Sequence, residues 1–229
     1  MLTQFPMMDQ ATQTHSLQQN RVLRNTYLLL AISMIPTVAG AFLGVSMGFS
    51  LFAGSPGISL LLFFGIAFGF MWGIRRMKNS GMGVVLLLGF TFFMGLMLSG
   101  ILRAALGFSN GPALIATAAG GTGAIFFTLA GIATVTKKDF GFIGRFLFVG
   151  LVVILLAMVA NYFLPIPALS LTISAAAILL FSGFILFDIS RIVNGGETNY
   201  ITATLAVYLD VYNIFVHLLH LLMALSGRD

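Results

Sequence analysis

The stretch Ile201–Leu225 reads ITATLAVYLDVYNIFVHLLHLLMAL and decides the kind of fold that this chain adopts. Asp210 is the only residue in it with a formal charge, so the stretch is apolar and long enough to cross a membrane as one helix. The whole chain has this character, because 59% of its 229 residues are hydrophobic and only 7% are charged. An ordinary soluble domain has roughly 25% charged residues. Much of this chain must therefore face lipid.

Further apolar runs precede this stretch, and turn-forming or charged clusters separate them. The predicted spans are Tyr27–Phe52, Gly57–Ile74, Gly83–Leu102, Pro112–Val135, Phe142–Leu164, Ala168–Ile192 and Ile201–Leu225. Residues 1–25 are polar and rich in glutamine, and they predict a mobile cytoplasmic tail. The sequence thus predicts an all-α membrane protein, in which residues 26–229 form a seven-transmembrane-helix bundle.

The distribution of basic residues predicts the orientation of this bundle. If the tail is cytoplasmic, the inner segments hold Arg21, Arg24, Arg75, Arg76, Lys78, Lys137, Lys138, Arg145 and Arg191, and the outer segments hold Arg103 and Arg228. Positive residues concentrate on the cytoplasmic side of membrane proteins. We therefore expect a multi-pass protein of the bacterial inner membrane with its N-terminus in the cytoplasm and its C-terminus outside.

Composition also excludes several kinds of site. The chain has no cysteine, so it has no disulfide, no thiolate metal site and no cysteine nucleophile. The net charge of +5 sits in short clusters between apolar runs, which favours loops that set membrane orientation over a nucleic-acid surface.

Small residues at helical spacing predict which helix faces pack closely, because close approach of backbones drives helix association in lipid. The predicted packing faces are Gly40-Gly44-Gly48, Gly65-Gly69-Gly73, Thr91-Gly95-Ser99 and Ala116-Gly120-Ala124. A compact bundle should result.

Two acids within the predicted spans are the strongest functional candidates, because an ionisable group in a membrane is costly. Asp188 lies near the inner end of the sixth span and Asp210 lies inside the seventh. A short turn joins these spans, so they should be adjacent and antiparallel, and their rise of ~1.5 Å per residue places both carboxyls at a similar depth.

The seventh span also carries a polar stripe. One helical face of this span combines small residues with Asp210, Asn213, His217 and His220, while most other positions hold large apolar residues. The histidines and Asn213 could simply hydrogen-bond to neighbouring helices. A metal site at His217 and His220 would lack further strong ligands nearby.

Four segments together resemble the transmembrane Bax inhibitor motif (Bax inhibitor/YccA-like) family, in its bacterial branch. They are Val22-Leu23-Arg24-Asn25-Thr26-Tyr27, Ile185-Leu186-Phe187-Asp188, Gly195-Gly196-Glu197-Thr198-Asn199-Tyr200-Ile201 and Leu205-Ala206-Val207-Tyr208-Leu209-Asp210-Val211-Tyr212-Asn213-Ile214-Phe215. The resemblance covers nearly the whole chain beyond the tail, and the last sixty residues carry its most specific part.

This resemblance implies a central helix ringed by the others, and one of two functions. Bacterial members are described as pH-sensitive calcium leak channels or as modulators of the membrane protease FtsH. The resemblance places the pH-sensing aspartate pair at Asp188 and Asp210 and the arginine that latches it at Arg75. Some channel-type members have an acid in the second span, where this chain has only apolar residues such as Phe64.

The pair itself carries a physical expectation. Two carboxylates ~4 Å apart repel by about 4 kcal/mol at an effective dielectric of ~20, so the pair should hold one proton near neutrality and titrate as a unit. Arg75 or Arg191 could neutralise the remaining charge. Calcium, expected as a permeant ion and not as a bound cofactor, suits oxygen ligands, but two carboxylates and Asn213 would hold it only weakly.

An intramembrane aspartyl protease is the remaining alternative. Two aspartates on adjacent spans and the run Pro167-Ala168-Leu169 resemble its motifs. The residues before Asp210 are Tyr208-Leu209 and not Gly-x-Gly, and the Pro-Ala-Leu run precedes the sixth span. We therefore expect no enzyme activity.

Overall fold

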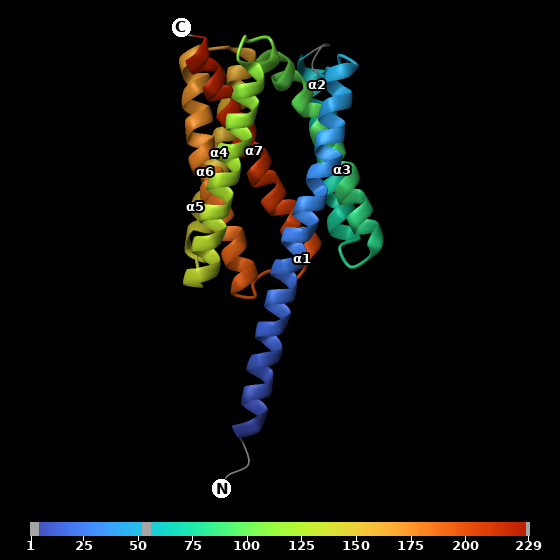
Figure 1. Ribbon diagram of the computed structural model, residues 1–229, viewed down its shortest axis with the longest axis vertical. Coiled ribbons are helices and arrows are strands. Elements are labelled where there is room, and N and C mark those ends of the chain that lie inside the picture. The colour runs from blue at the N-terminus through green and yellow to red at the C-terminus, as the bar shows by residue number, and fades with distance from the viewer. Residues whose placement is uncertain (1–4, 52–55, 228–229) are drawn as a thin grey trace.

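The computed structural model describes residues 5–51 and 56–227, and the side chains of residues 18–51 and 57–227. The helices are α1 (Phe5–Ser46), α2 (Pro56–Arg76), α3 (Gly81–Leu106), α4 (Gly111–Thr136), the 3₁₀ turn η2 (Gly141–Ile143), α5 (Gly144–Phe163), α6 (Pro167–Val193) and α7 (Tyr200–Ser226). Within these residues, seven helices are long and apolar enough to cross a membrane. The predicted all-α bundle is confirmed (Figure 1).

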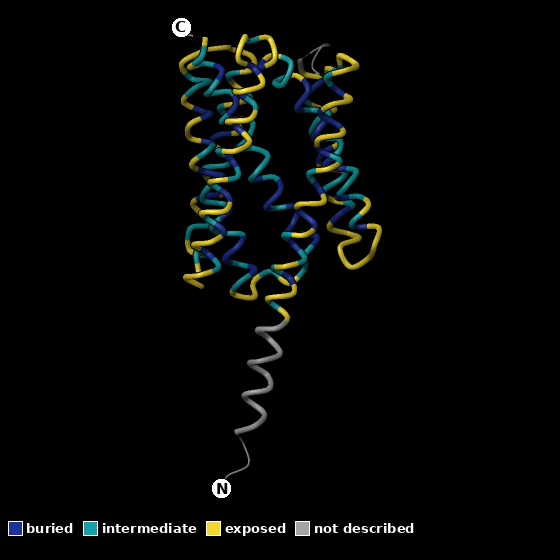
Figure 2. Tube along the Cα trace, viewed as in Figure 1, coloured by how far each residue is buried: buried dark blue, intermediate teal, exposed yellow. Residues whose placement is uncertain are grey.

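Helix α7 lies at the centre of the bundle. It packs against α1, α2, α3, α4 and α6, whereas α5 packs on the outer side of α6. Two tyrosines secure this position: the hydroxyl of Tyr208 lies 2.9 Å from the hydroxyl of Thr37 on α1, and Tyr212 donates to the carbonyl of Met94 on α3 (3.2 Å). Figure 2 shows α7 as a mostly buried or half-buried trace between two groups of helices.

The outer surface of the bundle is apolar, as lipid requires. Phe42, Phe127 and Phe142 are each more than 70% exposed. Charged residues gather at the end of the bundle where the α2–α3, α4–α5 and α6–α7 connections lie, which we call the basic end; the opposite end is the distal end (Figure 1). The basic end holds Arg75, Arg76, Lys78, Lys137, Lys138, Arg145 and Arg191.

The small-residue faces predicted on the first and third spans are confirmed, and they pack against each other, except at Gly48, which lies beyond the end of α1 and is exposed. A Cβ on Gly40 would lie 2.2 Å from the carbonyl oxygen of Phe92, and one on Gly95 would lie 2.1 Å from that of Thr37. Both gaps are far shorter than a carbon–oxygen contact allows, so only glycine lets α1 and α3 approach this closely.

The packing faces predicted on the second and fourth spans are wrong for most of their residues. A Cβ on Gly65, Gly69 or Gly120 would meet nothing within 4 Å, and Ala116 and Ala124 are exposed. Helix α4 instead buries Leu114, Ala118, Thr122, Phe126, Ala130 and Ala133. Regular spacing of small residues shows that a face is smooth, but not that a neighbouring helix lies against it.

Most of the predicted tail is helical in the structure. Helix α1 begins at Phe5 and has 42 residues, about 63 Å at 1.5 Å per residue. This exceeds the ~45 Å of a bilayer with its headgroups, and its first turns project beyond the basic end (Figure 1). The residues before Tyr27 include good helix formers such as glutamine, leucine and arginine, so the helix of the membrane segment continues toward the N-terminus. Residues 1–4 of this tail lie outside the described residues.

Candidate functional site

The α6–α7 turn sets the geometry of the site. Gly195 takes a positive φ of 79°, and the N–H of Gly196 donates to the carbonyl of Arg191 (2.7 Å), which closes α6. Asn199 then starts α7, because its side-chain oxygen accepts from the N–H of Ile201 (3.0 Å) and of Thr202 (3.2 Å). The side-chain nitrogen of Asn199 donates to the carbonyl of Lys78 (2.9 Å), so this turn is tied to the α2–α3 turn.

This tight turn brings Asp188 of α6 and Asp210 of α7 together. Their carboxyl groups are close enough to interact with each other electrostatically. Two ionised carboxylates have only acceptors, so a hydrogen bond between them requires a proton on one of the two. Asp210 is 4% exposed, and its buried Oδ2 atom has no hydrogen-bond partner among the described residues.

Both aspartates line one cavity of about 570 Å³ near the basic end. Its polar lining combines Asp188, Asp210 and Glu197 with Arg75, Lys78, Arg191 and the hydroxyl-bearing Thr202; the remainder is Met71, Leu151, Phe181, Phe184, Leu205, Ala206 and Leu209. Three acidic and three basic side chains thus surround a space that reaches a buried carboxyl. Lys78 and Glu197 were not among the predicted site residues, although both stand in the turns that flank the predicted spans.

The two predicted latch residues, Arg75 and Arg191, both line this cavity. Arg191 lies near enough to Asp188 for a direct electrostatic interaction, its guanidinium lies 5.5 Å from the centre of the Phe187 ring, and it donates to the carbonyl of Gly196 (3.4 Å). In the part of the chain that the structure describes, no ion pair of 4.0 Å or less joins either arginine to the aspartates. The two arginines therefore line the same cavity as the aspartates without forming a direct ion pair with them.

The polar stripe on α7 divides between two surroundings. Asp210 borders the cavity, but His217 and His220 lie nearer the distal end, where Ser174 of α6 lies 3.2 Å from Nδ1 of His217 and 2.9 Å from Nδ1 of His220. Asn213 donates back to the carbonyl of Leu209 (2.8 Å). Hydrogen bonding between helices thus accounts for both histidines, and no group of three or more metal-ligating side chains occurs among the residues described.

Sequence reasoning missed the partners of these polar groups. Ser174, Thr37 and Tyr208 each complete a hydrogen bond between two helices, but nothing in one sequence tells which serine or tyrosine meets which helix. Asp188 and Asp210, in contrast, were predicted to be neighbours because the short α6–α7 turn fixes which helices are adjacent and how their residues align.

The geometry also separates the aspartates from the Pro-Ala-Leu run. Pro167 begins α6 at the distal end, and Asp188 follows 21 residues later on the same helix, about 31 Å away. That run therefore lies at the other end of the bundle from the carboxyl pair.

Comparison with known proteins identifies the family. The profile of the family described as "Inhibitor of apoptosis-promoting Bax1" matches residues 19–227. The modulator of FtsH protease YccA of Escherichia coli strain K12 is 43% identical over 216 residues, which cover 94% of this chain and 95% of that protein. The inner membrane protein YccA of Escherichia coli O6:H1 matches equally well, and an uncharacterized membrane protein of Vibrio cholerae is 38% identical over 215 residues, 93% of this chain and 94% of that protein. With its seven apolar helices, this chain belongs to the Bax inhibitor family and is a multi-pass protein of the inner membrane.

Proposed function

We propose that this protein is a pH-sensitive cation leak, with calcium as a permeant ion and with Asp188 and Asp210 as its proton-controlled gate. The observation that carries this proposal is that two acids on adjacent membrane-spanning helices line one charged cavity and interact with each other electrostatically. An ionisable pair at this depth is expensive to bury, and such residues mark ion and proton paths in membrane proteins.

The gate works through one shared proton. With that proton in place, a hydrogen bond joins α6 to α7 and a single negative charge remains, which Arg75, Lys78 and Arg191 around the cavity offset. Without it, two anions face each other, and their repulsion of about 4 kcal/mol at ~4 Å must be relieved. A cation entering from the cavity or a separation of the two helices relieves it.

The ion path continues along the apolar part of the cavity wall. This part includes Met71, Leu151, Phe181 and Phe184. Such a wall bars a hydrated ion in the proton-bound state. Separation of α6 from α7 moves Phe181 and Phe184 away from α7 and opens this wall.

Calcium fits the donor groups as a passing ion. The carboxylates of Asp188, Asp210 and Glu197 and the hydroxyl of Thr202 line the cavity, and oxygen ligands suit calcium, which takes six to eight of them. The side chains present are fewer than that, so water must complete the shell and binding stays weak enough for release.

The cation leak is tested by calcium flux into liposomes that hold only this protein. Flux above that of empty liposomes supports the proposal, provided that a thiol reagent blocks calcium entry through an Ala206→Cys variant. Ala206 lines the cavity, and the wild-type chain has no cysteine, so a block by the reagent shows that the ion passes this cavity. A matched Ala119→Cys variant, on the exposed face of α4, should not respond. Flux equal to that of empty liposomes contradicts the proposal.

A second candidate function is restraint of the protease FtsH, which the name of the Escherichia coli relative favours. The first turns of α1, which project beyond the basic end, offer a protease in the cytoplasm a helical segment to bind (Figure 1). Overproduction should lengthen the lifetimes of FtsH substrates, and a chain without residues 1–17 should lose that effect. Unchanged lifetimes with the full chain, or no co-purification of FtsH, contradict this role.

A further inference from the structure

A second hollow, separate from the charged cavity, lies on the lipid-facing side of the bundle between α1 and α4. Its volume is about 630 Å³, and Val211 of α7 contributes to its wall. The remaining lining is Tyr27, Leu30, Ala31 and Met34 of α1, and Gly123, Phe126, Phe127, Ala130, Gly131, Thr134 and Val135 of α4. Apart from the hydroxyls of Tyr27 and Thr134, every lining side chain is apolar. We call this hollow the α1–α4 groove.

Small residues on α4 keep the groove open. A Cβ added at Gly123 or Gly131 would meet nothing within 4 Å, so no protein group fills the space beside them. The lining residues of α1 and α4 all lie in the half of each membrane span nearer the basic end. Nearer the distal end, Gly121 of α4 packs against α7, since a Cβ on it would lie 2.8 Å from Leu218.

The length of the groove matches one leaflet of a bilayer. From Gly123 to Val135 it follows twelve residues of α4, about 18 Å at 1.5 Å per residue, and half of a ~30 Å hydrocarbon core is ~15 Å. A partner helix would cross both leaflets and would need a face along the whole bundle. An acyl chain reaches only to the membrane midplane, so its length agrees with the groove.

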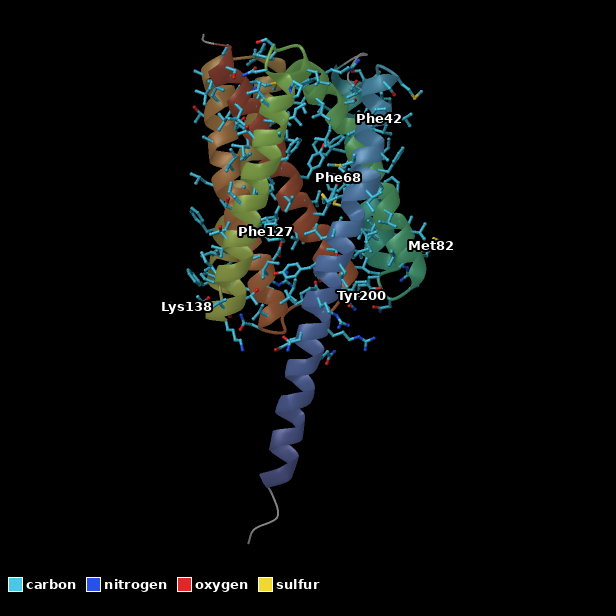
Figure 3. The ribbon with its side chains drawn as sticks, in the orientation of Figure 1. Phe42, Phe68, Met82, Phe127, Lys138 and Tyr200 are labelled. Carbon is cyan, nitrogen blue, oxygen red and sulfur yellow. The ribbon has the colours of Figure 1, made fainter. Side chains whose placement is uncertain are left out.

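Basic side chains stand at the mouth of the groove. Lys137 and Lys138 directly follow the end of α4, and Arg24 lies one turn before Tyr27 on α1; all three are exposed. Figure 3 shows Lys138 at the basic end of α4, below Phe127. The carboxylate of the adjacent Asp139 already accepts a hydrogen bond, which the N–H of Gly141 donates (2.7 Å). An apolar groove of one leaflet's length below a basic cluster is complementary to a lipid with a negative headgroup.

We propose that the α1–α4 groove binds one acyl chain of an anionic phospholipid, whose phosphate contacts Arg24, Lys137 and Lys138. The lipid fills the space that α1 and α4 leave beside α7. The site is distinct from the charged cavity, and it does not depend on the ion leak.

Native mass spectrometry of the full chain tests this site by counting lipids that remain bound after purification. We expect the wild-type protein to retain phosphatidylglycerol in preference to phosphatidylcholine. Gly123→Leu and Gly131→Leu fill the groove and should each lose one bound lipid, whereas Gly120→Leu, on an exposed position of the same helix outside the groove, should keep it.

The charges at the mouth have their own test. Lys137→Asn and Lys138→Gln should each weaken phosphatidylglycerol retention about fivefold, and Arg76→Gln, an exposed basic residue on α2, should not. Unchanged melting temperatures in lipid-free detergent establish that the variants fold. Equal retention of both lipids by the wild-type chain, or groove variants that keep every bound lipid, overturns the proposal. Loss of a co-purifying protein with no loss of lipid also overturns it and assigns the groove to a partner helix.

Discussion

Replacing Asp210 with asparagine removes the need for a shared proton while it keeps the contact with Asp188. The side-chain amide of asparagine donates a hydrogen bond to the Asp188 carboxylate at any pH. The shape of the buried side chain is nearly unchanged, which matters because Asp210 is only 4% exposed. The variant should therefore resemble the proton-bound state of the wild-type protein under all conditions.

The magnitude follows from the contact of the two carboxyl groups. If the folded protein holds one proton that the unfolded chain has released, its stability falls as the pH rises. The slope is at most about 1.4 kcal/mol per pH unit for one proton. The total loss of stability approaches the ~4 kcal/mol repulsion of two charges ~4 Å apart. At about 1.4 kcal/mol per pH unit, this loss of stability extends over about three pH units, unless the helices separate first.

Denaturant titration of the detergent-solubilised protein, followed by circular dichroism across pH, measures this slope. We expect the wild-type protein to lose stability as the pH rises and Asp210→Asn to lose far less. Asp139→Asn is the matched control, because Asp139 is an exposed acid at the same end of the bundle. Equal slopes for the wild-type protein and Asp210→Asn would refute proton sharing.

Three further predictions concern packing, the basic residues and orientation. Gly95→Ala should cost ~1–3 kcal/mol of stability by overpacking, because its Cβ would lie 2.1 Å from the Thr37 carbonyl oxygen. Gly69→Ala is the control and should cost nothing, because its Cβ would meet no atom within 4 Å. Unfolding of both variants in detergent measures the difference. Arg75→Ala should raise basal calcium leak in liposomes by removing a charge that offsets the pair, and Arg76→Ala, which does not line the cavity, should leave it unchanged. A cysteine at Ser80 should react with an impermeant reagent from the cytoplasmic side and one at Asn110 from the outside; the opposite pattern would contradict the orientation that the basic residues predict.

The length of the apolar runs predicted the spans well, because lipid requires each span to be apolar and long enough to cross the bilayer. The centre of every predicted span lies within a helix of the structure, and outside α1 the ends differ by a few residues. Helix α1 begins at Phe5 and not at Tyr27, and it ends at Ser46 and not at Phe52. Gly48, with φ of 67°, follows that end, and the apolar residues beyond it do not extend the helix.

Neighbour relations were predictable only where the chain itself enforces them. The short α6–α7 turn made Asp188 and Asp210 neighbours, and the structure places them together. No such constraint linked Gly65 or Gly120 to another helix, and both face outward. The contact of Ser174 with both histidines depends on the rotation of α6 about its axis, which one sequence does not specify.

Calcium flux into liposomes, measured from about pH 6 to about pH 8, tests the central claim that the Asp188–Asp210 pair is the gate. We predict that flux through the wild-type protein rises as the pair loses its proton, and that both Asp188→Asn and Asp210→Asn flatten this dependence while Asp139→Asn preserves it. If both dyad variants keep the wild-type flux at every pH, the pair is structural and the gate lies elsewhere.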